Sequence, residues 1–538
     1  MEVKDFSGKF FITRTAPIKS IKPPRPVSFP TAAACEAALQ IGIFFDGTGN
    51  SLAPKSGSSA RSNIARLYGT YPNEPTAGSY SIHVPGLGVP FPLIGEYDET
   101  RLGGAFASGG DGRIVYAILR VIDALHRSLF ATEMFGKDRI RALCAATPSD
   151  SEIRIVEQLG LHGNLVDDDK GVRRAKFLAV CLDDIRNRMQ NTKNVPKICS
   201  FSLDVFGFSR GATEARVFCH WMNDLLSKSS LAGVPVRFRF LGLMDTVASV
   251  GIVDGLTNRR ETGGHSCWAL PNVLRILPSV ENCVHLVAMH ELRKSFPLDT
   301  VSIDGTIPPN CIEFAYPGSH SDVGGGYASG ELDVSDKDSL KLSQIPLNHM
   351  FDCAVSSGVP LSKGLLSAAD KDMFAVDNDL KKAFDQFLHD STEVPRSLGD
   401  WALPYLVWRW QVRQTYQNTE QIQKANTEDR GLLWDANQYF CLSDEQIKNS
   451  RAYAEISSQQ TRSFSRSDTQ VGLLHLEMEA PALRARIAAL PKISPTLAEF
   501  FDKFVHDSVA GFRKQFVEAS GHWRYRRVFR GSATPYIG

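Results

Sequence analysis

Residues 198–212 contain the feature that most restricts the fold of this chain. An apolar run rich in β-forming residues ends at Gly207, and after Gly211 apolar residues recur at the spacing of one helix face. This pattern predicts a buried strand that turns directly into a helix, with Ser209 at the bend. Such a sharp turn needs small residues on both sides, which the two glycines supply. We therefore expect the Ser209 hydroxyl to stand above the edge of a sheet.

A serine in this setting needs partners, because a free hydroxyl is a poor nucleophile until an oriented base takes its proton. The G-x-S-x-G pattern around Ser209 is the nucleophile elbow of α/β-hydrolases, in which an acid and then a histidine follow later strands. Residues 237–244 are predicted to form a buried strand that Asp245 follows directly, and His320 follows a predicted strand at 311–316. We predict a triad of these three residues on an α/β fold, with a mostly parallel sheet flanked by helices.

Each of the three residues also has an ordinary interpretation. A serine beside glycine often serves only a turn, an aspartate after a strand often caps the backbone, and a lone histidine is often satisfied within its loop. Their occurrence at three strand ends, in the expected order, favours a triad over coincidence.

A second loop is predicted to complete the site. Residues 39–45 form a buried apolar run that ends in Asp46, Gly47 and Thr48. In hydrolases of this class, one backbone N–H of the oxyanion hole comes from an early loop and the other from the residue after the nucleophile. We therefore expect the donors to be the N–H of Arg210 and one from Asp46 to Thr48. The alternative is a glycine-rich turn that serves only the backbone.

The length of the chain predicts more than one unit, because 538 residues exceed what one ordinary core holds. Residues 1–37 are rich in proline with interspersed basic residues, which predicts an extended arm. Residues 38–365 form the predicted catalytic domain, with the more polar segment 130–195 as a candidate cap or insertion. Residues 366–538 are predicted to form a mainly helical accessory module.

Charge and cysteine content exclude several classes of function. The 60 basic and 59 acidic residues give a net charge of +1, which argues against nucleic acid as a partner. The 10 cysteines show neither a C-x-x-C pair nor zinc spacing, so we expect buried thiols in a reducing compartment. His290 and Glu291 lack the second histidine of H-E-x-x-H, because position 294 is lysine. We expect no metal and no cofactor.

An aromatic cluster suggests a contact with membranes. Trp401, Tyr405, Trp408 and Trp410 form the densest aromatic group in the chain, and residues 522–530 alternate cations with aromatic rings. Aromatic rings with arginine suit the headgroup region of a bilayer. The alternative is that both stretches pack onto the catalytic core.

Six stretches together resemble the α/β-hydrolase domain of type VI secretion lipase effectors, specifically the first of their phospholipase families. They are residues 44–50 (FFDGTGN), 62–68 (SNIARLY), 84–88 (VPGLG), 207–212 (GFSRGA), 244–247 (MDTV) and 319–327 (SHSDVGGGY). The last is the most specific, and the resemblance beyond about residue 365 is loose.

The resemblance implies that Ser209, Asp245 and His320 hydrolyse acyl esters of membrane phospholipids, as in a phospholipase A. It also implies injection into the periplasm of a competing cell, with a spike or tube protein of the secretion apparatus as carrier and a cognate immunity protein protecting the producer. The sequence start lacks the pattern of a secretory signal, so we expect synthesis in the bacterial cytoplasm and another export route. The sequence contains no run of about 20 apolar residues, so we expect no helix that spans a membrane.

Three alternatives remain open at this point. The same triad serves soluble carboxylesterases and thioesterases. The chain is also compatible with a non-catalytic component of a secretion apparatus that has a hydrolase-like fold. A metal-dependent phosphoesterase using Asp46 and Asp322 is a weaker choice, because no spaced cluster of carboxylates accompanies Asp46.

Overall fold

The computed structural model describes residues 36–52, 60–99, 109–166, 168, 171–192, 195–248, 265, 268–293, 296–391, 398–441, 483–511, 526–531 and 535–536. The arm predicted for residues 1–37 lies outside the described residues, except for its last two positions, which belong to the first strand.

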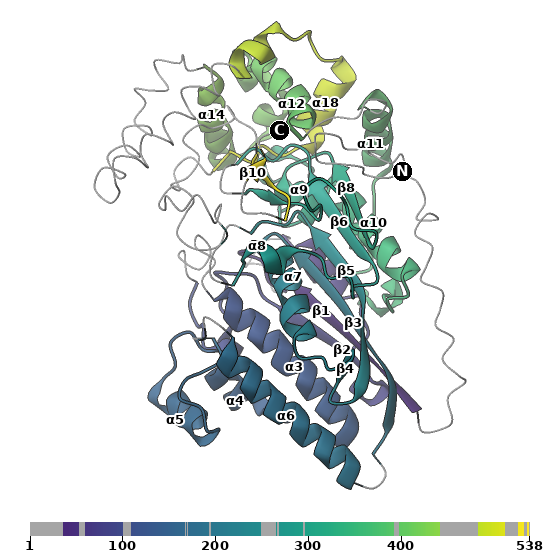
Figure 1. The fold of residues 1–538 in the computed structure, drawn as a ribbon. Coiled ribbons are helices and arrows are strands. Elements are labelled where there is room, and N and C mark those ends of the chain that lie inside the picture. The colour runs from purple at the N-terminus through teal and green to yellow at the C-terminus, as the bar shows by residue number, and fades with distance from the viewer. Residues whose placement is uncertain are drawn as a thin grey trace.

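A mostly parallel sheet forms the centre of the molecule (Figure 1). Its strands follow the order β2 (Ser79–Val84), β1 (Glu36–Phe45), β3 (Lys197–Phe208), β5 (Val234–Met244), β6 (Cys283–Ala288) and β8 (Cys311–Tyr316). Each neighbouring pair in this order is parallel, and the short β4 (Ser230–Leu231) pairs antiparallel with β5. The predicted α/β fold class is confirmed.

Side chains from one strand enter two different cores, because successive residues point to opposite faces of a sheet. Ile43 and Phe45 pack into one core and Phe44 into the other. The first core lies under α3 (Gly110–Phe130), α6 (Val172–Asn191) and α7 (Arg210–Asn223), and the second lies under α1 (Asn63–Tyr68) and α10 (Gln344–Ser356). Burial on both faces explains why these strands are near-continuous apolar runs in the sequence.

The segment 130–195 folds into helices at one end of the molecule. It contains α4 (Gly136–Cys144), α5 (Asp150–Gln158) and α6, which occupy the lower end of Figure 1, whereas α9 (His320–Gly324) lies in the upper half, beside β8. The role of this segment as a cap or insertion stays a prediction.

The C-terminal helices share a core with the sheet. They are α11 (Asn378–Ser391), α12 (Leu398–Val412), α13 (Glu420–Lys424), α14 (Thr427–Cys441) and α18 (Pro495–Phe504). Phe387, Leu406 and Phe501, from α11, α12 and α18, belong to the same apolar cluster as Phe44 and Leu286 of the sheet. The predicted division at residue 365 therefore does not separate two apolar cores.

The structure corrects the membrane contact expected from the aromatic cluster. Trp401, Tyr405 and Trp408 are only 3%, 2% and 3% exposed, and Trp410 packs half-buried against the same core. The cause is that α12 is apolar around most of its circumference, as in helices enclosed by protein. These side chains stabilise the docking of α12 and do not face a bilayer in this structure.

Two short elements lie beside the main sheet, namely α8 (Pro271–Leu274) and a small sheet of β7 (Leu298–Asp299), β9 (Val528–Phe529) and β10 (Pro535–Tyr536).

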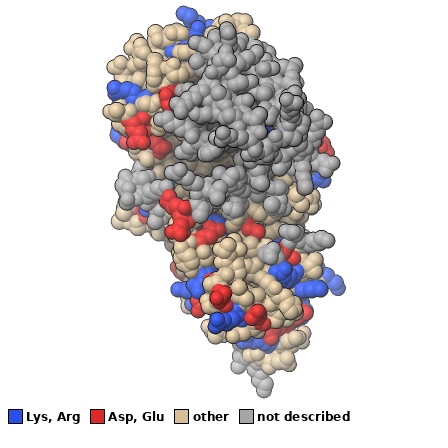
Figure 2. Space-filling view, turned by 90° about the vertical axis from the view of Figure 1, so that its left-hand side faces the viewer, with Lys and Arg blue, Asp and Glu red and all other residues tan. Residues whose placement is uncertain are grey.

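On the face in Figure 2, basic and acidic side chains of the described residues are interspersed, particularly over the lower part. Among the described residues, no helix combines the length and apolar character needed to cross a membrane.

Candidate active site

Ser209 occupies the turn between β3 and α7, with φ 59° and ψ −127°. A serine rarely adopts a left-handed backbone, and such strain persists only where the surrounding structure holds it. Its N–H donates to the carbonyl oxygen of Met244, the last residue of β5, at 3.0 Å. Ser209 therefore lies at the carboxyl ends of two neighbouring central strands, where open α/β sheets bind ligands.

Two glycines leave room for this turn. A Cβ atom at Gly207 would lie 2.4 Å from the carbonyl oxygen of Gly211, and a Cβ at Gly211 would lie 2.3 Å from that of Asp46. Both obstacles are backbone atoms, so side-chain movement cannot relieve the clash. The requirement for small residues on both sides of Ser209 is thus confirmed.

Gly211→Ala is expected to lower the free energy of unfolding by about 1–3 kcal/mol, because the added methyl overpacks against the chain that follows β1. Alanine normally stabilises a helix by about 1 kcal/mol relative to glycine. A loss of stability in Gly211→Ala would therefore show that the added methyl group does not fit. Gly431→Ala in α14 is the matched control, because nothing lies within 4 Å of a Cβ there. Urea unfolding measures both variants, and a stabilised Gly211→Ala protein would contradict the packing.

Asp245 follows β5 directly and is fully buried. Its Oδ1 accepts a hydrogen bond from the N–H of Ala288 at 2.8 Å, and its Oδ2 lies 2.5 Å from Nδ1 of His320. Ala288 ends the adjacent strand β6. The structure thus brings together the acid and the base predicted from the sequence, although 75 positions separate them.

His320 is the first residue of α9, and its ring packs between two aromatic rings. The ring centroids of Phe208 and Phe296 lie 4.6 and 4.8 Å from that of His320. Since Phe208 precedes Ser209, the imidazole lies next to the elbow. Nδ1 faces Asp245, and Nε2 is buried without a hydrogen-bond partner among the described residues. Nε2 is therefore the nitrogen left to accept a proton.

The environment keeps His320 uncharged near neutral pH. Burial lowers its pKa below the ordinary value of 6.5, although the hydrogen bond and charge of Asp245 act to raise it. Burial alone would raise the pKa of Asp245, but the charge of Arg526 and the bond to His320 lower it below its ordinary value. An ionised acid beside a neutral imidazole is the resting state that a general base requires.

Three charged residues around this pair were not predicted from the sequence. Arg526 donates from Nη1 and Nη2 to the two carboxylate oxygens of Asp245, at 2.8 and 2.7 Å. Glu291 accepts the backbone N–H of His320 at 3.2 Å and is itself held by Nε and Nη2 of Arg293, at 2.9 and 2.8 Å. Burial alone would raise the pKa of Glu291, but Arg293 lowers it to about 2.

Only weak signals pointed to these residues. Glu291 belongs to an incomplete H-E-x-x-H pattern, and Arg526 belongs to the stretch in which cations alternate with aromatic rings. Arg526 is 281 positions from Asp245, and no local pattern indicates that pairing. The part of the stretch before Arg526 lies outside the described residues.

Asp322 links α9 to the C-terminal region. Its Oδ2 accepts the N–H of Ser319 at 2.8 Å, and its Oδ1 lies 2.6 Å from Nδ1 of His506. The His506 ring stacks on Tyr327 with a centroid distance of 3.8 Å. Asp322 therefore holds the helix that begins at His320 against the segment after α18.

The loop after β1 offers fewer free donors than the sequence suggested. The N–H of Asp46 donates to Val84 at 3.0 Å, as part of the strand pairing, and that of Gly47 donates to the Asp46 carboxylate at 2.9 Å. Among the described residues, no hydrogen bond is assigned to the N–H of Thr48, and its buried hydroxyl also lacks a partner. Arg210 is the first residue of α7 and directly follows Ser209.

The Asp46 carboxylate is engaged in holding this loop. Its Oδ1 accepts from the hydroxyl of Ser62 at 2.5 Å, and its Oδ2 lies 3.1 Å from Nε2 of His83. Within the part of the chain that the structure describes, no group of three or more His, Cys, Asp or Glu side chains is arranged to hold a metal ion. The Asp46 carboxylate is thus engaged by Ser62, His83 and the N–H of Gly47.

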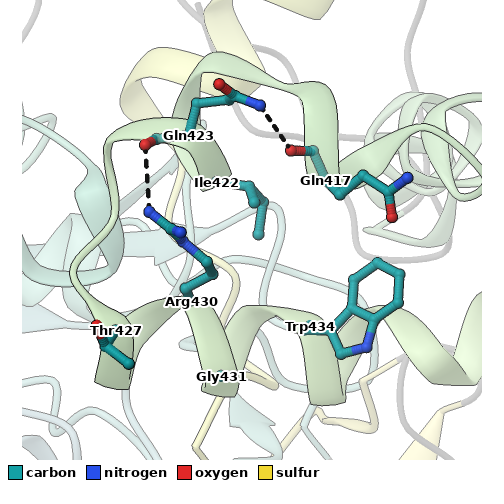
Figure 3. A pocket seen from close by; sticks show the side chains of 7 residues that line it. All are labelled: Gln417, Ile422, Gln423, Thr427, Arg430, Gly431 and Trp434. Atoms are coloured by element: carbon teal, nitrogen blue, oxygen red, sulfur yellow. Dashed lines mark hydrogen bonds between the residues drawn. The ribbon is translucent and has the colours of Figure 1, made fainter.

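A cavity of about 510 Å³ has a lining that includes none of Ser209, Asp245 and His320 (Figure 3). It is lined by Gln417, Ile422, Gln423, Thr427, Arg430, Gly431 and Trp434, from α13, α14 and the turn before them. None of these residues contacts Ser209, Asp245 or His320 through a hydrogen bond, so we do not place the chemistry there.

The geometry of the strand ends suits acyl transfer. A strained serine, a buried imidazole with one open nitrogen and an ionised aspartate are the components of a nucleophile, a base and its orienting group. The N–H groups of Arg210 and Thr48 are candidates to stabilise an oxyanion. These roles remain predictions.

Comparisons with known proteins add a partial match. A family model described as "T6SS, Phospholipase effector Tle1-like, catalytic domain" matches residues 225–353. That stretch contains Asp245 and His320 but not Ser209. The curated proteins searched include no match to this sequence.

Two solved structures are similar to this one. The crystal structure of an uncharacterized protein from Pseudomonas aeruginosa aligns with a TM-score of 0.69 and 24% identity, covering 93% of this chain and 80% of that one. The structure of the Tle1 effector bound to the VgrG spike from the Type 6 secretion system aligns with a TM-score of 0.34 and 18% identity, covering 67% and 81%. The first likeness shows a shared fold, and the family model shows that residues 225–353 are similar to the catalytic domain of a phospholipase effector.

Proposed function

We propose that this protein hydrolyses the acyl ester bonds of membrane glycerophospholipids, with Ser209 as nucleophile, His320 as general base and Asp245 as its orienting acid. The observation that carries the proposal is the buried Asp245–His320 hydrogen bond, which leaves Nε2 of His320 without a partner beside the strained elbow of Ser209. The match of residues 225–353 to a phospholipase effector domain supports a lipid ester as substrate.

The reaction proceeds in two steps. Nε2 of His320 takes the Ser209 proton while the serine oxygen attacks the ester carbonyl, and the N–H groups of Arg210 and Thr48 stabilise the oxyanion. The oxyanion collapses, the C–O bond breaks, and His320 gives its proton to the departing lysophospholipid. His320 then takes a proton from water as the water oxygen attacks the acyl-enzyme. The bond between the acyl group and the Ser209 oxygen breaks, His320 gives its proton to that oxygen, and the fatty acid leaves.

We further propose that the protein is a type VI secretion effector that acts in the periplasm of a target bacterium. The support is the description of the family model, which names this secretion system. A spike protein as carrier and an immunity protein in the producing cell are parts of the same proposal. For the effector in the second solved structure, a bound spike is stated.

Hydrolysis of vesicles made from a phospholipid with two distinguishable acyl chains tests the function. We expect a fatty acid and a lysophospholipid in equal amounts, insensitivity to a metal chelator, and a rate that increases sharply once the lipid forms aggregates. A soluble esterase or thioesterase would instead prefer monomeric short-chain esters. A protein that releases no fatty acid from either substrate would contradict the proposal.

The rate is expected to depend on pH through His320. Only the neutral imidazole acts as a base, so kcat/KM should be full above the His320 pKa and fall as the pH drops through it. Because burial lowers that pKa, the acid midpoint should lie below the ordinary 6.5. A pH profile of kcat/KM with a soluble ester measures this midpoint, and a value above 6.5 would show that the burial and charge described do not govern the base.

A further inference from the structure

Arg526 makes the most extensive set of polar contacts to the predicted acid. Its two Nη atoms donate to both carboxylate oxygens of Asp245, and its Nε donates to the carbonyl oxygen of Phe296 at 2.6 Å. The residue is 3% exposed. Three oriented donors in a buried setting give the guanidinium a single geometry, unlike an ion pair at the surface.

The neighbouring backbone fixes this position. Residues Val528–Phe529 form β9, which pairs in parallel with Leu298–Asp299 of β7. The N–H of Leu298 donates to the carbonyl oxygen of Arg527 at 2.8 Å, and both residues of β9 are buried. The chain near its C-terminal end is thereby attached beside the loop that follows β5. Arg526 lies two positions before β9 and reaches Asp245 from outside the main sheet.

The charges around His320 form two closed pairs. Asp245 is neutralised by Arg526, and Glu291 is neutralised by Arg293, with two hydrogen bonds in each pair. A single unpaired carboxylate in contact with a buried imidazole would favour its protonation, because an opposite charge at this distance stabilises the charged form. Because an arginine neutralises each of the two carboxylates, their attraction for a protonated His320 is reduced.

The acidic side chain of α9 itself, Asp322, is also paired. Asp322 lies 2.6 Å from His506, and among the described residues Ser319 provides its other side-chain contact. Arg526 is the cation that hydrogen-bonds directly to Asp245, the acid of the triad.

We propose that Arg526 is a positioning residue of the triad: by holding both oxygens of Asp245, it keeps the acid ionised and oriented and leaves His320 uncharged at neutral pH. The segment that leads into β9 is then a part of the catalytic site. The inference rests on the proposed function, because it assigns a role to Arg526 through the base of that reaction.

Arg526→Met tests the charge. We expect the acid limb of kcat/KM to move upward by about one pH unit or more, because the unpaired Asp245 carboxylate would hold a proton on His320. The loss of activity should therefore be larger at acid than at alkaline pH. Arg527→Met is the matched control, since it removes a cation from the adjacent position and should leave the limb unchanged.

Arg526→Lys separates charge from geometry. It retains a cation but not the planar pair of donors, so we expect the wild-type acid limb with a kcat lowered several-fold. Arg526→Gln replaces the methionine variant if that protein does not fold, with the same expected shift. The proposal would be overturned if the acid limb of kcat/KM were unchanged in the methionine or glutamine variant. It would also be overturned if the acid limb of the lysine variant shifted as far as that of the methionine variant.

Ser209→Ala separates a failure of the proposed function from a failure of the role proposed for Arg526. If Ser209→Ala retains the parent rate, the proposed function fails whatever Arg526 does. If Ser209→Ala is inactive and Arg526→Met has an unchanged pH profile, the function stands and only the role of Arg526 fails.

Discussion

Ser209→Ala is expected to lower kcat for phospholipid hydrolysis by about 10⁴-fold or more, since it removes the only atom that forms the acyl-enzyme. KM should change little, because the hydroxyl adds little to ground-state binding. The fold should be retained, since the side chain of Ser209 accepts and donates no assigned hydrogen bond among the described residues, and its backbone bond to Met244 does not depend on the side chain.

Fatty acid release from phospholipid vesicles measures this effect. Ser200→Ala is the matched control, because it changes a serine in the same strand, β3, before the elbow. The control should retain the parent rate. A Ser209→Ala protein that releases fatty acid at the parent rate would remove Ser209 from the mechanism.

Asp245→Asn is expected to lower kcat by about 10³–10⁴-fold, because an amide does not hold His320 in the tautomer that leaves Nε2 open to the serine proton. The variant should also lose stability, by about 3–5 kcal/mol, because Arg526 is left as an unpaired buried cation. When Asp245→Asn is combined with Arg526→Met, much of this loss should disappear, since the cation is then absent. Urea unfolding and vesicle hydrolysis measure the two effects.

Asp204→Asn separates catalysis from stability. Asp204 also forms a buried ion pair, with Nε of Arg239 at 2.7 Å, and lies in β3 below the elbow. Its variant should lose stability to a similar extent and retain kcat at temperatures where it is folded. If the two variants lost kcat equally, the effect of Asp245 would be one of folding and not of the triad.

The sheet and the strand ends could be predicted because their signals are local. The segments that form β3, β5 and β8 are rich in apolar residues, and a parallel sheet enclosed by helices produces that composition. Asp245 and His320 were predicted from their places directly after such runs. Their hydrogen bond confirms that the two strand ends meet.

The contributions from distant segments could not be predicted in this way. Arg526 meets Asp245 through a strand pairing between β9 and β7, and each strand has only two residues. The aromatic residues of α12 have the composition of a membrane interface and equally that of a core, and only packing against Phe501 and the sheet decides between them. The donors of the loop after β1 were likewise undecided, because strand pairing with β2 consumes one of them.

Covalent labelling with a fluorophosphonate tests the central claim most directly, because the reagent reacts with a serine only when a base activates it. Mass spectrometry of digested protein should find one label per chain, on Ser209, and labelling should be slowed strongly in His320→Gln. Labelling of another residue, or of Ser209 at an undiminished rate in His320→Gln, would contradict the assignment of Ser209, His320 and Asp245 as one catalytic unit.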